Sequence, residues 1–185
     1  YEVLVYDTVT NDLISSNIVG EKGGSLSIFP GTYHLVIYSL GTESTQQKDL
    51  HKRNTANAFT TDITVSKGEV IKSKINELTS EPVSKGYEDD PIINEPDHLY
   101  TSNEMNVTID AFTGGEQVVT IHTTVSTILD VYSLEVLNIK GAENIEKVEA
   151  FVTGQILSNY FGRPERDSSP ATVYVDMSVD LENSR

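Results

Sequence analysis

Apolar and polar residues alternate along most of this chain, which is the spacing expected of β-strands with one buried face. Residues 32–40 form the clearest run, with Tyr33, Leu35 and Ile37 on one face and the even-numbered residues on the other. Residues 172–181 alternate in the same way. Apolar residues do not recur at helical spacing over three turns anywhere in the sequence. The pattern therefore predicts an all-β protein.

Short turn sequences separate the predicted strands. Pro30-Gly31 predicts one turn, because proline presets φ and glycine tolerates positive φ. Lys67-Gly68 and Gly114-Gly115 are further tight connections, which favour antiparallel pairing of the strands that they join. The remaining predicted strands are residues 1–7, 13–19, 25–29, 58–65, 69–78, 104–112, 117–125, 132–139 and 148–154.

Residues 79–98 differ in character from the rest of the chain, because they hold three prolines, six acidic residues and one lysine. Proline cannot donate to a strand ladder, and like charges extend a segment. We therefore predict two antiparallel β-sandwich domains in tandem, joined by an acidic, proline-containing linker. The predicted boundaries are residues 1–80 for the first sandwich, 81–97 for the linker and 98–185 for the second, whose completeness the sequence leaves open.

Two polar segments are predicted as loops. Residues 41–57 form the longer one, and a loop of that length in a compact domain is functional or mobile. The second covers residues 160–170 and begins with Tyr160 and Phe161, which could form an exposed aromatic platform for a ligand such as a sugar. The alternative is that both rings pack in the core or in a turn. Residues 142–147 are compatible with a single helical turn.

The net charge of −15, from 28 acidic and 13 basic residues, limits the classes of partner. Phosphate recognition needs clustered lysine and arginine, so we expect no nucleic-acid partner. Adsorption to an anionic lipid surface is disfavoured for the same reason. The charge instead favours solubility and repulsion between copies.

The chain contains no cysteine, which excludes a disulfide framework, a thiol nucleophile and a thiolate metal site. No stretch reaches the roughly 20 apolar residues that span a bilayer. Residues 1–7 have strand composition from Tyr1 onward, without an initiator methionine. We therefore expect a trimmed or processed chain whose targeting segments lie outside it.

The sequence shows no catalytic or metal-binding pattern. No two of its four histidines are close in sequence, and no G-x-S-x-G segment is present. The acidic runs at residues 88–90 and 95–97 lack the order of a calcium-binding loop. We therefore predict a protein that is not an enzyme and that has no cofactor and no metal.

Four segments resemble the Bacteroidales fimbrillin-like surface lipoproteins. Residues 29–43, FPGTYHLVIYSLGTE, resemble the strand, turn and Gly-Thr-Glu segment of an early domain in that family. Residues 58–60 resemble the strand start after the long loop, and residues 94–100 the entry to the second domain. Residues 148–154 resemble the second-domain strand that ends in a Ser/Thr-Gly pair.

The resemblance implies that both predicted sandwiches are transthyretin-like. It also implies a non-enzymatic structural or adhesion protein, either a fimbrial subunit or a fimbria-associated lipoprotein of the outer-membrane surface. An N-terminal lipid anchor outside this chain would be its contact with the membrane. Other fimbrial subunits or surface proteins would be its partners, through donation of a β-strand to an open sheet edge. The segments expected to take part are residues 1–7 and 172–181. The alternative function is a glycan-binding surface lipoprotein that uses Tyr160 and Phe161.

Overall fold

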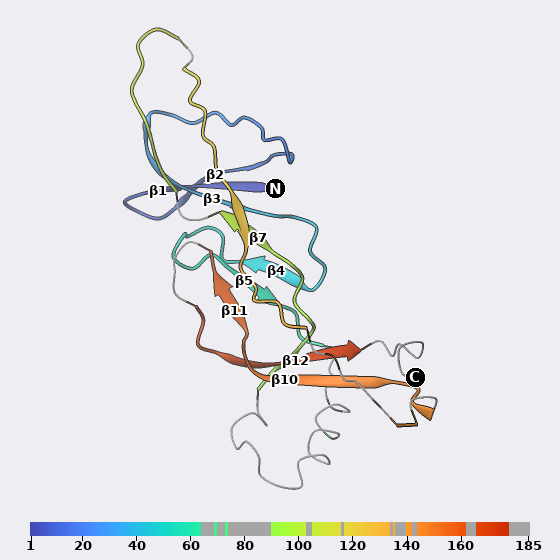
Figure 1. The fold of residues 1–185 in the computed structure, drawn as a ribbon. Helices are drawn as coiled ribbons and strands as arrows, with labels where there is room; N and C mark the ends of the chain where they lie inside the picture. Colours follow the sequence, from blue (N-terminus) through green and yellow to red (C-terminus); the bar gives the residue numbers. More distant parts are fainter. Residues whose placement is uncertain are drawn as a thin grey trace. The chain divides into compact units, whose positions relative to one another are not determined.

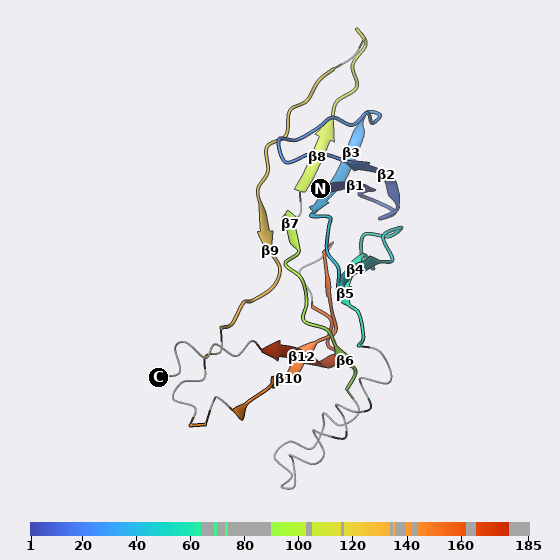
Figure 2. The ribbon, with the colours of Figure 1, turned by 90° about the vertical axis from the view of Figure 1, so that its right-hand side faces the viewer.

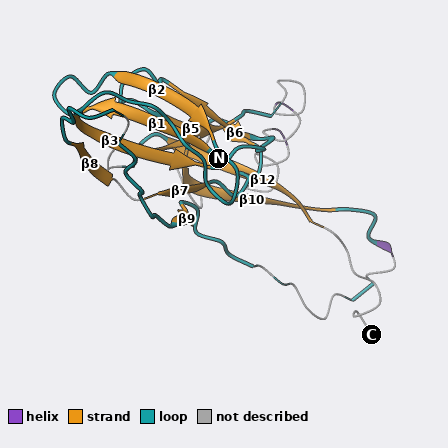
Figure 3. Cartoon of the chain, turned by 90° about the horizontal axis from the view of Figure 1, so that it is seen from above, coloured by secondary structure: helices purple, strands orange, loops and turns teal. Residues whose placement is uncertain are grey.

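The computed structural model describes residues 1–63, 69, 73, 90–102, 105–115, 117–133, 135, 140–141, 144–161 and 166–177. Within this part of the chain, every element with defined bounds is a β-strand, and Figure 3 shows these strands in orange between loops. The prediction of an all-β protein is confirmed. Most strand pairs are antiparallel, as predicted. One pair is parallel, between β6 (Ile92–Ile93) and β12 (Pro170–Met177).

Contacts between Cα atoms divide the chain into two compact units. Unit 1 comprises Tyr1–Phe59, Asp97–Leu129 and Ser158–Asp167, and unit 2 comprises Thr60–Pro96, Asp130–Leu157 and Ser168–Arg185. Each unit therefore takes residues from both predicted domains. The tandem boundaries at residues 80 and 98 stay a prediction, and residues 81–89 of the predicted linker lie outside the described residues.

A six-stranded sheet forms the main part of unit 1. Its strands are β1 (Glu2–Asp7), β2 (Leu13–Ile18), β3 (Gly31–Tyr38), β7 (Tyr100–Ser102), β8 (Met105–Ile109) and β9 (Val125–Thr127). Neighbouring strands follow the order β2-β1-β3-β7-β9, and β8 also pairs with β3 (Figures 1 and 2). β1 and β3 therefore lie at the centre of the sheet.

The two faces of β3 contribute to two different hydrophobic clusters, which confirms the predicted alternation. Tyr33 and Leu35 belong to one cluster, and Val36 and Tyr38 belong to the other. β1 alternates in the same way, with Val3 and Val5 in the first cluster and Leu4 and Tyr6 in the second. Because both faces of the central strands are covered, these strands carry apolar residues at nearly every position.

Two three-stranded sheets complete the described architecture. In unit 1, β4 (Thr45–Lys48), β5 (Asn57–Thr60) and β11 (Ser158–Tyr160) follow the order β11-β5-β4. In unit 2, β10 (Val148–Ile156) pairs with β12, which also pairs with β6. The β10–β12 register shifts between Val152 and Gln155, where Gly154 has a φ of 72°. Glycine accepts this conformation, so β10 continues through the irregularity and does not end at Gly154 as predicted.

Several predicted strands are wrong. Residues 25–29 form no ladder, although Leu26 and Ile28 pack against a cluster as the alternation predicts. Alternation determines which side chains face the core, but it does not supply a neighbouring strand for the backbone. Residues 117–124 likewise belong to no strand, and β9 begins only at Val125. The described residues of the predicted strand 132–139 are not in a strand either.

Two other segments differ from prediction for different reasons. The predicted loop 41–57 contains β4, whose polar residues suit its place as the outer strand of its sheet. Glu69 and Ser73 have helical backbone where a strand over residues 69–78 was predicted. Apolar residues at positions 71, 75 and 78 have the helical spacings of four and three, and this signal was outweighed by the Lys67-Gly68 turn. The rest of that segment lies outside the described residues.

Candidate functional site

The predicted aromatic pair divides between the surface and the core. Phe161 is buried, and its ring stacks on that of Tyr38 with centroids 5.3 Å apart and planes 15° apart. Its backbone N–H donates to Ala56 O at 3.2 Å. Tyr160 ends β11 and is half-buried. Phe161 therefore packs in the core, as the alternative interpretation of the sequence has it. Its ring cannot serve as an exposed platform.

A different pair of rings is exposed and stacked. His98 and Tyr100 are both exposed, and their ring centroids lie 6.5 Å apart with planes 28° apart. Leu99, between them, is fully buried in the cluster that contains Tyr38 and Phe161. The polar–apolar–polar order of His98, Leu99 and Tyr100 is the sequence signal for two exposed rings around a buried residue. From the sequence alone, this segment was identified only as resembling the entry to a second domain.

Asp97 fixes the backbone immediately before this pair. One oxygen of its carboxylate, Oδ2, accepts hydrogen bonds from the backbone N–H groups of Glu43 at 2.8 Å, Ser44 at 2.6 Å and Thr45 at 2.8 Å. The Ser44 hydroxyl donates to the same oxygen at 2.9 Å. In return, Asp97 N–H donates to Thr45 Oγ1 at 2.9 Å. We call these contacts the Asp97 clasp.

The clasp also determines the charge of Asp97. Partial burial of the carboxyl would raise its pKa, but hydrogen bonds from Thr45, Ser44 and Glu43 outweigh burial and lower the pKa below the ordinary value of 3.8. Asp97 is therefore ionised at neutral pH. On the other side of the ring pair, Tyr100 N–H donates to Ser39 Oγ at 3.0 Å, and Ser39 N–H donates to Tyr100 O at 2.8 Å. The ring pair thus sits on a backbone that is held at both ends.

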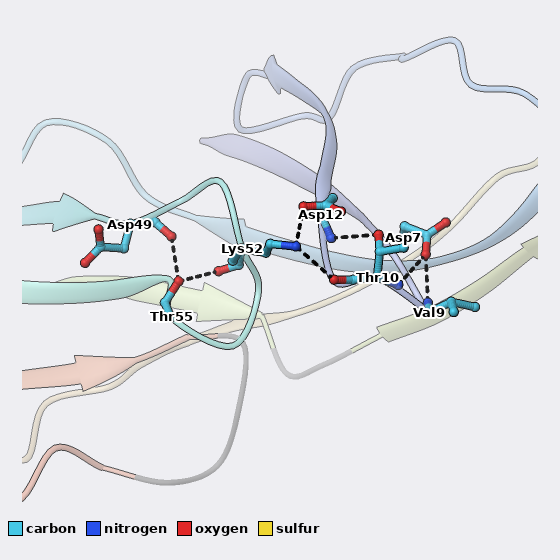
Figure 4. Close-up of polar contacts among 7 residues, drawn as sticks. All are labelled: Asp7, Val9, Thr10, Asp12, Asp49, Lys52 and Thr55. Atoms are coloured by element: carbon cyan, nitrogen blue, oxygen red, sulfur yellow. Dashed lines mark hydrogen bonds and ion pairs between the residues drawn. The ribbon is translucent and has the colours of Figure 1, made fainter.

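The turn between β1 and β2 holds another polar cluster, drawn in Figure 4. Asp7 Oδ1 accepts from the N–H groups of Val9 at 2.8 Å and Thr10 at 2.7 Å. Lys52 Nζ lies 2.6 Å from Asp12 Oδ1 and donates to Thr10 O at 3.3 Å. Hydrogen bonds from the Thr10 and Val9 N–H groups lower the pKa of Asp7. The pKa of Asp12 is also lowered, chiefly by its hydrogen bond with Lys52. Asp7 and Asp12 both bind groups of this chain. The cluster therefore stabilises the turn and joins it to Lys52.

A lysine in unit 2 lies among acceptors. Lys147 Nζ lies 3.1 Å from both Glu149 Oε1 and Asp176 Oδ2, and 3.2 Å from the Tyr174 hydroxyl. The hydrogen bond with Tyr174, then those with Asp176 and Glu149, raise the pKa of Lys147 above its ordinary value. A lysine that holds its proton is neither a nucleophile nor a general base at neutral pH. The cluster instead ties β10 to β12 across the sheet.

The two segments expected to take part in strand donation are already paired. β1 lies between β2 and β3, and β12 lies between β10 and β6. In contrast, the strands at the ends of the three sheets each have one strand neighbour within the described part of the chain, and so does β8. The open positions for an added strand are therefore at β2, β4, β6, β8, β9, β10 and β11, which the sequence did not distinguish from the rest.

Neither a metal centre nor a membrane helix is found within the described ranges. No group of three or more histidine, aspartate or glutamate side chains there could hold a metal ion. No helix among the same residues is both long and apolar enough to span a bilayer.

Comparison with a solved structure supports the all-β fold. The chain is similar to a protein of Bacteroides ovatus that is provisionally described as an adhesin, with a TM-score of 0.56 and 18% sequence identity. The alignment covers 92% of this chain and 53% of the Bacteroides ovatus chain. This chain therefore spans about half the length of the Bacteroides ovatus protein. No curated protein matches the sequence.

Comparison with protein families gives a match over nearly the whole chain. Residues 1–176 match the family described as a domain of unknown function, DUF5119. The match includes both clusters of unit 1, the Asp97 clasp, and the β10–β12 pair except Met177. The chain belongs to the DUF5119 family.

Proposed function

We propose that this chain is part of a non-enzymatic adhesion protein of the cell surface, as a fimbrial subunit or a fimbria-associated lipoprotein. The observation that carries the proposal is the fold that the chain shares with the Bacteroides ovatus protein, which is provisionally described as an adhesin. The polar clusters described above suit this role, because they build turns and join strands.

Assembly with other subunits would use an open sheet edge. A strand at the edge of a sheet presents unpaired N–H and C=O groups, and an extended segment of a neighbouring protein can complete the ladder. Among the described strands, those with one strand neighbour have this position: β2, β4, β6, β8, β9, β10 and β11. An outer-membrane location, with a lipid anchor upstream of Tyr1, completes the proposal.

Polymer formation tests the fimbrial part of the proposal. The purified chain would be examined by negative-stain electron microscopy and by sedimentation, alone and with peptides that copy the sequences of β1 and β12. We expect fibres, or a peptide that binds and stays bound through a sizing column. A strict monomer that binds no peptide would argue against assembly by strand addition.

Glycan binding is the second candidate function, and the His98–Tyr100 pair favours it. Sugar rings present apolar C–H faces that pack on exposed aromatic rings, and a fixed backbone lowers the cost of ordering the site. A glycan array would compare the native protein with Tyr100→Ala. Tyr132→Ala is the matched control, because Tyr132 is also exposed but has no ring partner in the described structure. Binding lost in Tyr100→Ala alone supports the site, and silence of the native protein across the array contradicts it.

A further inference from the structure

The segment that leads into β9 has the composition of a strand but no strand partner. Each of residues 117–124 is exposed, and none of them belongs to a ladder. Six of these eight residues are valine, isoleucine or threonine, which favour extended backbone. Figure 2 shows the chain leaving the end of β8, running beyond the sheet and returning to β9. The segment therefore offers strand-forming backbone next to a strand that is itself at the edge.

The same region is free of acidic and basic charge. Residues 117–129 contain no Asp, Glu, Lys or Arg, although these residues make up 22% of the chain. In contrast, the open strand β10 contains Glu149 and follows directly after Lys147. A chain with a net charge of −15 repels its own copies, and the repulsion is weakest where no charged side chain lies at the contact. The edge strand β2 carries no charge either, but it is paired with β1 along its length. Residues 117–124 are uncharged, unpaired and exposed throughout, which suits them to meet a second acidic chain.

Two copies of this run can also pair with each other as antiparallel strands. Two identical strands that pair antiparallel are related by a two-fold axis, so each residue type meets the same set of neighbours in both copies. Like charges opposite each other destabilise such a pair, and none is present here. Val118, Val119 and Ile121 expose 89%, 42% and 41% of their surface in the single chain, and pairing would cover part of it.

We propose that residues 117–127, the exposed segment together with β9, pair with the same residues of a second copy to form a two-fold dimer. The six-stranded sheet would then continue from one copy into the other through β9. This inference goes beyond the adhesion role and does not depend on it, because a closed two-fold pair forms whether or not the protein also polymerises.

Charge complementation provides the test. Thr120 and Thr124 flank His122, the middle of the run, and their side chains fall on the same face of a strand. Sedimentation equilibrium would measure dimerisation of the native chain, of the Thr120→Glu/Thr124→Glu variant and of the Thr120→Lys/Thr124→Lys variant. We expect each variant alone to dimerise about tenfold more weakly or worse, because like charges face each other across the axis. Mixed in equal amounts, the two variants should recover close to native dimerisation.

Substitutions at Val9, outside the proposed interface, provide the control. Val9→Glu and Val9→Lys change the charge of an exposed turn residue and should leave dimerisation within about twofold of native. A native chain that stays monomeric across the concentration series would overturn the proposal. So would two impaired variants that fail to recover on mixing, because pairing of the run with β8 of its own chain, or with a different protein, predicts no recovery.

Discussion

Phe161 and Asp97 show how single residues position the candidate site. Phe161 lies in the same cluster as Leu99, the residue that orients the exposed rings of His98 and Tyr100. Asp97 fixes the backbone just before those rings through three N–H groups and a hydroxyl. Both residues therefore act on the ring pair through structure, and neither is expected to contact a ligand.

Replacing the two aromatic residues of the predicted loop separates core packing from surface contact. Phe161→Ala should lower the free energy of unfolding by about 3–5 kcal/mol, because it removes a buried ring and leaves a cavity beside Tyr38. Tyr160→Ala, the matched control at a half-buried position, should cost about 1–2 kcal/mol. Urea unfolding followed by circular dichroism measures both. Equal, small effects would contradict the core position of Phe161.

The Asp97 clasp makes stability depend on pH. Because the pKa of Asp97 is lowered on folding, its carboxylate stabilises the protein above the unfolded-state value of about 3.8 and loses this effect as pH falls through the folded-state pKa. Asp97→Ala should cost about 2 kcal/mol at pH 7. The difference between native and variant should shrink below pH 4 in urea titrations. A difference that stays constant from pH 7 to pH 3 would show that the charge is irrelevant.

Strands can be predicted from the sequence where the local alternation of apolar and polar residues determines them. The alternation in β3 and β12 correctly predicted strands, and in β3 it also predicted which side chains share a face. The same pattern over residues 25–29 identified the inward side chains but not the missing ladder. Pairing depends on a partner elsewhere in the chain, and periodicity carries no information about it.

Long-range contacts explain why the candidate site was not predicted. Asp97 and the loop that it holds are 52 to 54 residues apart, and Phe161 reaches Tyr38 from the far end of the sequence. The sequence predicted a strand over residues 1–7 but not that β1 pairs on both sides. Neither the clasp nor the central position of β1 has a signal in the local order of residues.

The central position of β1 gives a prediction at the scale of the element. Deleting residues 1–7 removes Val3 and Val5 from one cluster and Leu4 and Tyr6 from the other. Unit 1 should then lose cooperative unfolding, which thermal melts followed by near-ultraviolet circular dichroism would report. The comparison is Val9→Ser, at an exposed turn residue, with native-like melting expected. A native-like melt of the chain without residues 1–7 would instead support a first strand that can leave the sheet.

At the scale of the whole molecule, the net charge of −15 opposes association and a charge-free edge permits it. Salt screens the repulsion, because the Debye length falls from about 30 Å at 0.01 M to about 8 Å at 0.15 M ionic strength. Dimerisation of the native chain should therefore strengthen as sodium chloride is raised over this range. Sedimentation measures the effect, and dimers that weaken with salt would indicate contact through ion pairs instead.

The proposed adhesion role requires the chain to lie at the cell surface. Immunogold electron microscopy of intact native cells, with antibodies raised against the purified chain, shows whether it does. We expect gold particles on fibres or on the outer surface of cells that have not been permeabilised, and none on cells in which the gene is deleted. Labelling that appears only after permeabilisation would contradict it.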